Sequence, residues 1–206
     1  MKILYRILKR FLDIAVSLSV LTLTLPFILL IAVAIRITMG SPVFFRQQRP
    51  GLKARPFYLT KFRTMRNPRK GEESAEFDSE RITRIGRFLR SVSLDELPTL
   101  WNVLKGNMSL VGPRPLLMQY LDRYTPQQAR RHEVKPGITG WAQVNGRNAI
   151  TWKDKFRFDV WYVDNQSLWL DLRILCMTAV KVLKREGISH GTGATMPEFM
   201  GSEKED

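Results

Sequence analysis

The chain contains little cysteine and little histidine, and this scarcity excludes several kinds of site. Among 206 residues there is one cysteine, Cys176, and there are two histidines, His132 and His190. A single cysteine cannot form an internal disulfide bond, so a reducing compartment is expected. Two isolated histidines without a cysteine cluster do not make a zinc site. Any metal should therefore be a hard cation bound by oxygen, and Mg²⁺ is the natural choice beside phosphates.

Two familiar phosphate-binding loops are also absent from the sequence. There is no G-x-x-x-x-G-K-[ST] loop and no G-x-G-x-x-G at the start of a helix. Negative charge is scarce as well, because 19 Asp and Glu face 33 Lys and Arg, which gives a net charge of +14. Such a surplus indicates an anionic partner, which can be nucleic acid, phospholipid headgroups or a phosphorylated substrate.

Charge is wholly absent from Ile14 to Ile35, a stretch about long enough to cross a bilayer core. It is longer than the apolar core of a signal peptide and no small-residue cleavage pattern follows it, so we expect it to stay in the membrane. Pro26 lies near its middle, where proline kinks or breaks a helix. Basic residues flank both sides, which holds both ends in the cytoplasm. We therefore expect residues 1–40 to form a re-entrant helix broken at Pro26. A tilted, kinked single span is the alternative.

Residues 41–188 predict a compact cytoplasmic domain of the α+β class, mostly helical, with short strands and surface or amphipathic helices. The strands are expected between residues 41 and about 66, where β-prone pieces are bounded by proline and glycine. Residues 189–206 are small and polar and predict a loosely ordered tail. The segments expected to be helical are 81–90, 95–105, 116–124, 126–132, 152–164 and 168–185.

Two adjacent carboxylates, Asp95 and Glu96, stand at the start of a predicted helix. A capping box, with Ser93 as the cap and Glu96 as its reciprocal partner, is one interpretation. Pro98 weakens it, because proline is best tolerated within the first turn, which moves the helix start toward the two acids. Both carboxylates then lie at the positive end of the helix dipole and stay ionised. An ionised pair suits a metal ligand or an anionic nucleophile, and capping is the alternative left open.

Candidate phosphate-binding cations accompany this pair. Arg114 stands between Pro113 and Pro115, which restrict the backbone, and a stiffly presented guanidinium suits bidentate recognition of phosphate or carboxylate. A structural turn with an ion pair is the competing interpretation. Arg147 follows a Gly-rich stretch in which backbone amides can approach a ligand. Further cations are Lys61, in a segment that could also be an exposed basic strand, and Arg90.

In their order along the chain, these motifs resemble those of the small bacterial monotopic phosphoglycosyl transferases, the PglC-like bacterial sugar transferases. The match runs nearly from end to end and includes the proline in the membrane segment. One position departs from the family, in which the break is often Ser-Pro, whereas this chain has Leu25-Pro26; Thr22 or Thr24 could replace the serine hydroxyl. The matching motifs are Lys9 to Asp13, Gln48 to Gly51, Lys61 to Met65, Arg90 to Pro98, Asn102 to Gly106, Val111 to Pro115, Lys135 to Gly140 and Val144 to Asn148.

The resemblance implies a reaction and a set of roles. A UDP-sugar, with an N-acetylated amino sugar as the expected sugar, donates its sugar-1-phosphate to polyprenyl (undecaprenyl) phosphate and releases UMP. Asp95 is implied to be the nucleophile that forms an aspartyl-phosphosugar intermediate. Glu96 is implied to hold Mg²⁺ together with Asp95 or to assist the acceptor. The implied phosphate-binding residues are Lys61, Arg90, Arg114 and Arg147.

The resemblance also implies a location and partners. The protein is expected to be monotopic at the cytoplasmic face of the bacterial inner membrane, with both ends cytoplasmic. Its expected partners are the UDP-sugar, polyprenyl phosphate and membrane phospholipid, and not nucleic acid; a homo-oligomer is left open. The rival is a membrane-tethered basic module that binds nucleic acid or anionic lipid without catalysis. That alternative leaves the carboxylate pair Asp95 and Glu96 unexplained. The sequence also contains no stacked-aromatic motif of the kind that recognises nucleic acid.

Overall fold

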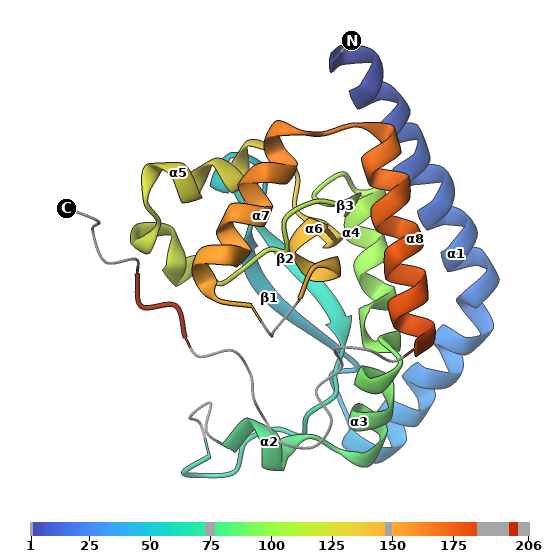
Figure 1. The fold of residues 1–206 in the computed structure, drawn as a ribbon. Helices are drawn as coiled ribbons and strands as arrows, with labels where there is room; N and C mark the ends of the chain where they lie inside the picture. The colour runs from blue at the N-terminus through green and yellow to red at the C-terminus, as the bar shows by residue number, and fades with distance from the viewer. Residues whose placement is uncertain (1, 73–76, 147–149, 185–197, 202–206) are drawn as a thin grey trace.

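One long helix, α1 (Lys2–Met39), runs along the outside of a set of short helices and strands (Figure 1). It lies beside α8 (Leu168–Lys184) and α4 (Leu100–Leu104), and the sheet of the first two strands lies on the side of these helices away from α1. Helices predominate and the strands are short, which confirms the predicted mostly helical α+β class. The computed structural model describes residues 2–72, 77–146, 150–184 and 198–201.

Helix α1 continues through Pro26 and bends along its length instead of breaking (Figure 1). The predicted pair of helices separated at Pro26 is therefore one bent helix. Thr24 Oγ1 donates a hydrogen bond to the Val20 carbonyl at 2.6 Å, and such back-bonding is associated with helix bending. Among the residues described, Ile3–Met39 is the one helix long and apolar enough to cross a membrane, and only 6% of its most apolar window is buried.

Polar side chains dock the first half of α1 on the domain. Asp13, only 4% exposed, accepts hydrogen bonds from Ser109 Oγ at 3.0 Å and from the Leu110 backbone N–H at 2.9 Å. These two residues belong to the strand β3 (Ser109–Val111), so hydrogen bonds connect the helix to a strand. Lys9 Nζ lies 2.7 Å from Asp171 Oδ2 of α8. The motif from Lys9 to Asp13 thus fastens α1 to two other elements.

Two arginines extend this docking by capping helix C-termini, where the last carbonyls have no intrahelical partner. Arg10 donates to the carbonyls of Val103 and Leu104, at 2.6 and 2.7 Å, at the end of α4. In the half of α1 that follows Pro26, Ile35 is fully buried in a cluster with Phe62 and Leu89. Arg63 caps the other end of α1, where it donates to the carbonyls of Met39, Gly40 and Ser41.

The strands form two small sheets. Strands β1 (Phe44–Pro50) and β2 (Pro56–Phe62) pair antiparallel, as the proline-bounded pieces predict. Strands β3 (Ser109–Val111) and β4 (Gly137–Thr139) pair in parallel, although the sequence predicts strands only between residues 41 and about 66. A β-carbon on Gly137 would lie 2.1 Å from the Gly112 backbone nitrogen. Glycine at this position therefore allows the close backbone contact beside the loop that carries Arg114.

The remaining elements surround these sheets. Of the predicted tail, the structure describes residues 198–201, in which Phe199 is buried against Tyr120 and Phe156. Cys176 is exposed on α8. The other α-helices are α2 (Asp78–Arg81), α3 (Arg84–Ser91), α5 (Pro126–Ala129), α6 (Trp141–Val144) and α7 (Trp152–Asp164), and the 3₁₀ helices are η1 (Leu52–Ala54), η3 (Leu94–Thr99), η4 (Met118–Arg123) and η5 (Arg130–Glu133).

Replacing Asp13 with alanine tests the docking of α1. The change leaves the buried N–H of Leu110 and the hydroxyl of Ser109 without their acceptor, so we expect the free energy of unfolding to fall by about 1–3 kcal/mol. Thermal unfolding of the detergent-solubilised protein measures this. The matched control is Asp122→Ala, at an exposed aspartate of η4. Equal midpoints for the two variants would show that Asp13 does not anchor the helix.

Candidate active site

The carboxylate pair lies in the 3₁₀ helix η3, and not in the first turn of an α-helix as predicted. The α-helix α4 begins only at Leu100. Ser93 has a left-handed backbone with φ of 58°, and its side chain makes no capping hydrogen bond, so the capping box is not present. Pro98 lies inside η3 and is buried. The backbone around Asp95 and Glu96 therefore serves to present these acids to neighbouring elements.

Glu96 is held between two cations. Lys61 Nζ, on β2, lies 2.6 Å from Glu96 Oε1, and the Arg114 guanidinium donates to both carboxylate oxygens. Burial alone would raise the pKa of Glu96, but Arg114 and Lys61 outweigh it and hold the pKa well below its ordinary value. Glu96 is therefore ionised throughout the neutral range. The predicted residues Lys61, Glu96 and Arg114 form one cluster.

Asp95 lies beside this cluster and differs from its neighbour. Among the residues that the structure describes, none makes a hydrogen bond or an ion pair with the Asp95 carboxylate. Burial raises the pKa of Asp95 and the charge of Glu96 adds to the rise, while Lys61, Arg90 and Arg114 oppose it. Two adjacent acids thus have pKa values displaced in opposite directions, which is typical of acids with separate roles.

The other predicted cations fall into two groups. Arg90, on α3, is near enough to Asp95 to lower its pKa, and its Nε donates to Thr64 Oγ1 at 2.9 Å. It therefore belongs to the site. Arg147 lies outside the residues that the structure describes. Its neighbour Gly146 lines the same cavity as Glu96.

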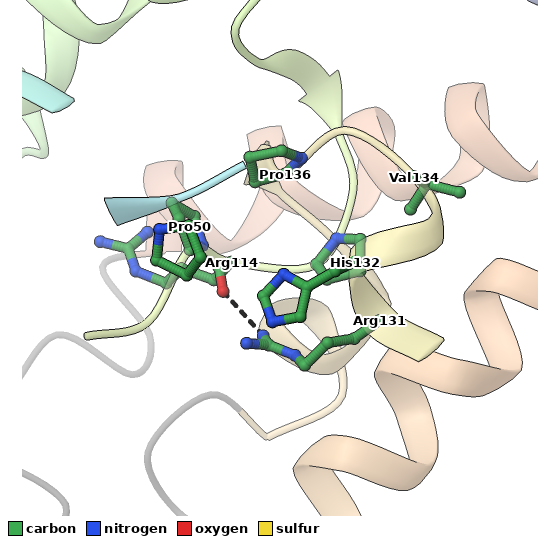
Figure 2. A pocket seen from close by; sticks show the side chains of 8 residues that line it. Pro50, Arg114, Arg131, His132, Val134 and Pro136 are labelled. Atoms are coloured by element: carbon green, nitrogen blue, oxygen red, sulfur yellow. Dashed lines mark hydrogen bonds between the residues drawn. The ribbon is translucent and has the colours of Figure 1, made fainter. Parts of the chain in front are cut away.

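A buried ion pair that the sequence analysis missed supports the loop of Arg114. Arg131 and Asp159 are 1% and 2% exposed, and their charged atoms lie 2.7 Å apart. Arg131 Nη2 also donates to the Arg114 carbonyl at 2.7 Å. Figure 2 shows that this carbonyl faces Arg131 while the Arg114 guanidinium points away from it. Beside them, burial and the charge of Arg131 lower the pKa of His132 to about 4, so His132 is neutral at pH 7.

A cavity of about 250 Å³ opens beside the cluster. Apolar side chains and polar or charged side chains both line it. The apolar lining residues include Leu97, Leu100, Ile138, Val144 and Val182, and the polar ones are Ser93, Glu96, Arg114, Thr139, Gln143, Thr178 and Lys181.

The carboxylates fit only a magnesium ion held largely by other ligands. The described part of the chain contains no group of three or more His, Cys, Asp or Glu side chains placed to hold a metal. Both oxygens of Glu96 are engaged by cations, which leaves Asp95 as the open carboxylate. Mg²⁺ is commonly held by one or two carboxylates, with phosphate oxygens and water completing its shell. The donor set is compatible with that mode of binding.

The low pKa of Glu96 predicts a pH-dependent contribution to stability. The stabilisation is complete above the pKa of an unfolded glutamate, about 4.3, and is lost as the pH falls toward the folded value. Unfolding free energies of wild type and Glu96→Gln should therefore differ most above about pH 5 and converge in acid. The exposed Glu133→Gln variant is the control. A difference that stays constant from neutral to acid pH would contradict the ion-pair geometry.

Comparison with known proteins identifies the family. The profile of the family described as bacterial sugar transferase matches residues 4–185. The uncharacterized sugar transferase EpsL of Bacillus subtilis is 57% identical over 95% of this chain and 97% of its own length. The UDP-glucose:undecaprenyl-phosphate glucose-1-phosphate transferase of Xanthomonas campestris is 48% identical over 77% of this chain and 35% of its own. The undecaprenyl-phosphate galactose phosphotransferase of Salmonella typhimurium is 41% identical over 88% of this chain and 42% of its own length. The chain spans less than half of these two longer proteins, and it belongs to the bacterial sugar transferase family.

Proposed function

We propose that this chain is a phosphoglycosyl transferase that moves a sugar-1-phosphate from a UDP-sugar to polyprenyl phosphate. The observation that carries the proposal is the unequal pair of acids. Glu96 is held by Lys61 and Arg114, while Asp95 beside it has a carboxylate without a hydrogen-bonding partner among the described residues. The relatives from Xanthomonas campestris and Salmonella typhimurium act on undecaprenyl phosphate by their descriptions, and the first of them also on UDP-glucose, which supports this reaction class.

In the proposed first step Asp95 acts as the nucleophile. A carboxylate oxygen attacks the β-phosphorus of the donor, the bond between that phosphorus and the bridging oxygen breaks, and UMP leaves with the bond electrons. The sugar phosphate is then joined to Asp95 by an acyl phosphate bond. In the second step an oxygen of the acceptor phosphate attacks the same phosphorus and frees the carboxylate, giving polyprenyl-diphosphate-sugar.

The cations around the acids support this chemistry. Arg114 exposes 38% of its side chain beside the cavity, so its guanidinium can contact a donor phosphate while it also holds Glu96. Arg90 favours the ionised form of Asp95. Asp95 would hold Mg²⁺ with the donor phosphates, with Glu96 as the predicted second ligand or acceptor-assisting group. When bound, the ion would neutralise charge on the diphosphate.

The docking of α1 supports a monotopic arrangement with both helix ends on one face of the membrane. The first half contacts the domain through Lys9 and Asp13, and the second half through Ile35 and the carbonyls capped by Arg63. A helix that crossed the bilayer would place its ends on opposite sides, where one folded domain cannot contact both. The side of α1 away from the domain is apolar and exposed, at Leu23, Phe27, Leu30 and Ile37 among others. We propose that it enters the inner membrane from the cytoplasmic side and returns.

The reaction is tested by UMP release. Wild type should release UMP from a UDP-sugar over many turnovers only when polyprenyl phosphate and Mg²⁺ are present, with at most one UMP per protein molecule when the acceptor is left out. Asp95→Asn should lower turnover by about 10³-fold or more. The donors to compare are UDP-glucose, UDP-galactose and a UDP-N-acetylated amino sugar. Asp122→Asn, at an exposed aspartate, is the control. Absence of UMP release with all donors, together with salt-dependent binding of nucleic acid, would favour the basic binding module instead.

Membrane topology is tested by cysteine labelling. The exposed Cys176 is first replaced by serine, and single cysteines are then placed at Ile3 and Ser41, near the two ends of α1. In sealed membrane vesicles, a maleimide that cannot cross the membrane should label both of these cysteines only when the cytoplasmic face of the membrane is on the outside. A cysteine at Asp122, in the catalytic domain, marks that face. Labelling of the two ends from opposite faces would show a single span.

A further inference from the structure

The cavity beside the carboxylate pair contains a buried amide group, that of Gln143. Gln143 lines the cavity together with Glu96 and Arg114. Its Oε1 and Nε2 atoms are both buried, and neither has a hydrogen-bond partner among the residues that the structure describes. Buried polar side-chain atoms are nearly always hydrogen-bonded in folded proteins, so an amide with both ends unpaired requires an explanation. A ligand that enters the cavity supplies one.

The surroundings hold this amide in place. Gln143 lies on α6, whose other residues Ala142 and Val144 are buried, and the ring of Trp141 stacks on Trp161 at 4.9 Å between centroids. A β-carbon added to Gly140 would lie 2.9 Å from Gln143 Oε1. The amide thus sits against the backbone at the start of α6, and the absence of a side chain at Gly140 leaves room for it.

The chemistry of the amide restricts the group that it can bind. Nε2 donates hydrogen bonds and Oε1 accepts them, so the matching group must both accept and donate. Sugar hydroxyls, an acetamido group and the imide edge of uracil meet this condition. An ionised phosphate does not, because it has no hydrogen to donate to Oε1. The isoprene chain of the acceptor forms no hydrogen bonds at all.

We propose that Gln143 is a specificity-determining residue that hydrogen-bonds a neutral group of the nucleotide sugar, on either the sugar or the uracil. The inference rests on the proposed function, because it needs a donor of that class. The cations Arg114 and Lys181 line the same cavity and are suited to bind the anionic diphosphate of the donor. Gln143 forms hydrogen bonds with an uncharged part, the sugar or the uracil.

Ligand binding in an Asp95→Asn background tests the proposal without turnover. Gln143→Met keeps the approximate volume and removes both polar atoms, and Gln143→Ala is the second variant. We expect the Kd of the UDP-sugar to rise by about tenfold, the effect of losing one or two neutral hydrogen bonds. The Kd of UMP shows which part of the donor Gln143 contacts. It rises as much as the Kd of the UDP-sugar if the amide contacts uracil, and it stays unchanged if the amide contacts the sugar. Gln127→Met, at an exposed glutamine of α5, is the control.

Thermal unfolding of the unliganded variants separates ligand recognition from a structural role. Since the amide has no partner in the described part of the chain, Gln143→Met should unfold at the same temperature as its parent or a higher one. Unchanged Kd values for both ligands, or a lowered unfolding midpoint with unchanged Kd, would overturn the inference. Wild type that binds UDP-sugar through Gln143 but releases no UMP would contradict the proposed function and not this inference.

Discussion

The pairing of the half-buried carboxylate of Glu96 with Lys61 and Arg114 is the interaction on which the site depends. A carboxylate removed from water is strongly unfavourable unless cations and hydrogen bonds compensate it. Its partners come from separate elements, Lys61 from β2 and Arg114 from the loop after β3. The pair of cations is equally dependent on Glu96, because without it two positive charges would face each other in a partly buried place. The negative charge of Glu96 therefore holds three elements together: the strand β2, the 3₁₀ helix η3 and the loop after β3.

That arrangement leaves Asp95 with a distinct environment. The cluster places Lys61, Arg90 and Arg114 near Asp95, yet their hydrogen bonds go elsewhere: to Glu96 from Lys61 and Arg114, and to Thr64 from Arg90. The neighbouring cations favour the ionised form without occupying its oxygens. Behind the site, Arg131 fixes the Arg114 carbonyl and so determines where the guanidinium can reach. The cations near Asp95 therefore have two roles: they hold the neighbouring elements together, and in the proposed reaction they favour the ionised nucleophile.

Local signals in the sequence predict part of this structure. The uncharged run predicts α1, prolines mark the β1–β2 hairpin, and Lys61, Arg90, Asp95, Glu96 and Arg114 do gather, as the motifs indicate. Pro26 predicts a break by a local rule, but contacts along both halves of α1 hold it as one bent helix.

Other features have no local signal. Three-residue strands such as β3 and β4 show no period, and their pairing depends on the close approach of Gly112 and Gly137. The Arg131–Asp159 ion pair lies in ordinary helical patterns, and Gln143 lies in a stretch for which the sequence predicts neither a helix nor a strand. Only burial distinguishes these side chains.

The division of roles between the two acids is tested most directly by locating the covalent intermediate. Purified protein is incubated with a UDP-sugar labelled in the β-phosphate, without acceptor, and the labelled peptide is sequenced by mass spectrometry. The account predicts label on Asp95, retained in Glu133→Gln and absent from Asp95→Asn. Label on Glu96, or no covalent label from a preparation that turns over when acceptor is added, would contradict it.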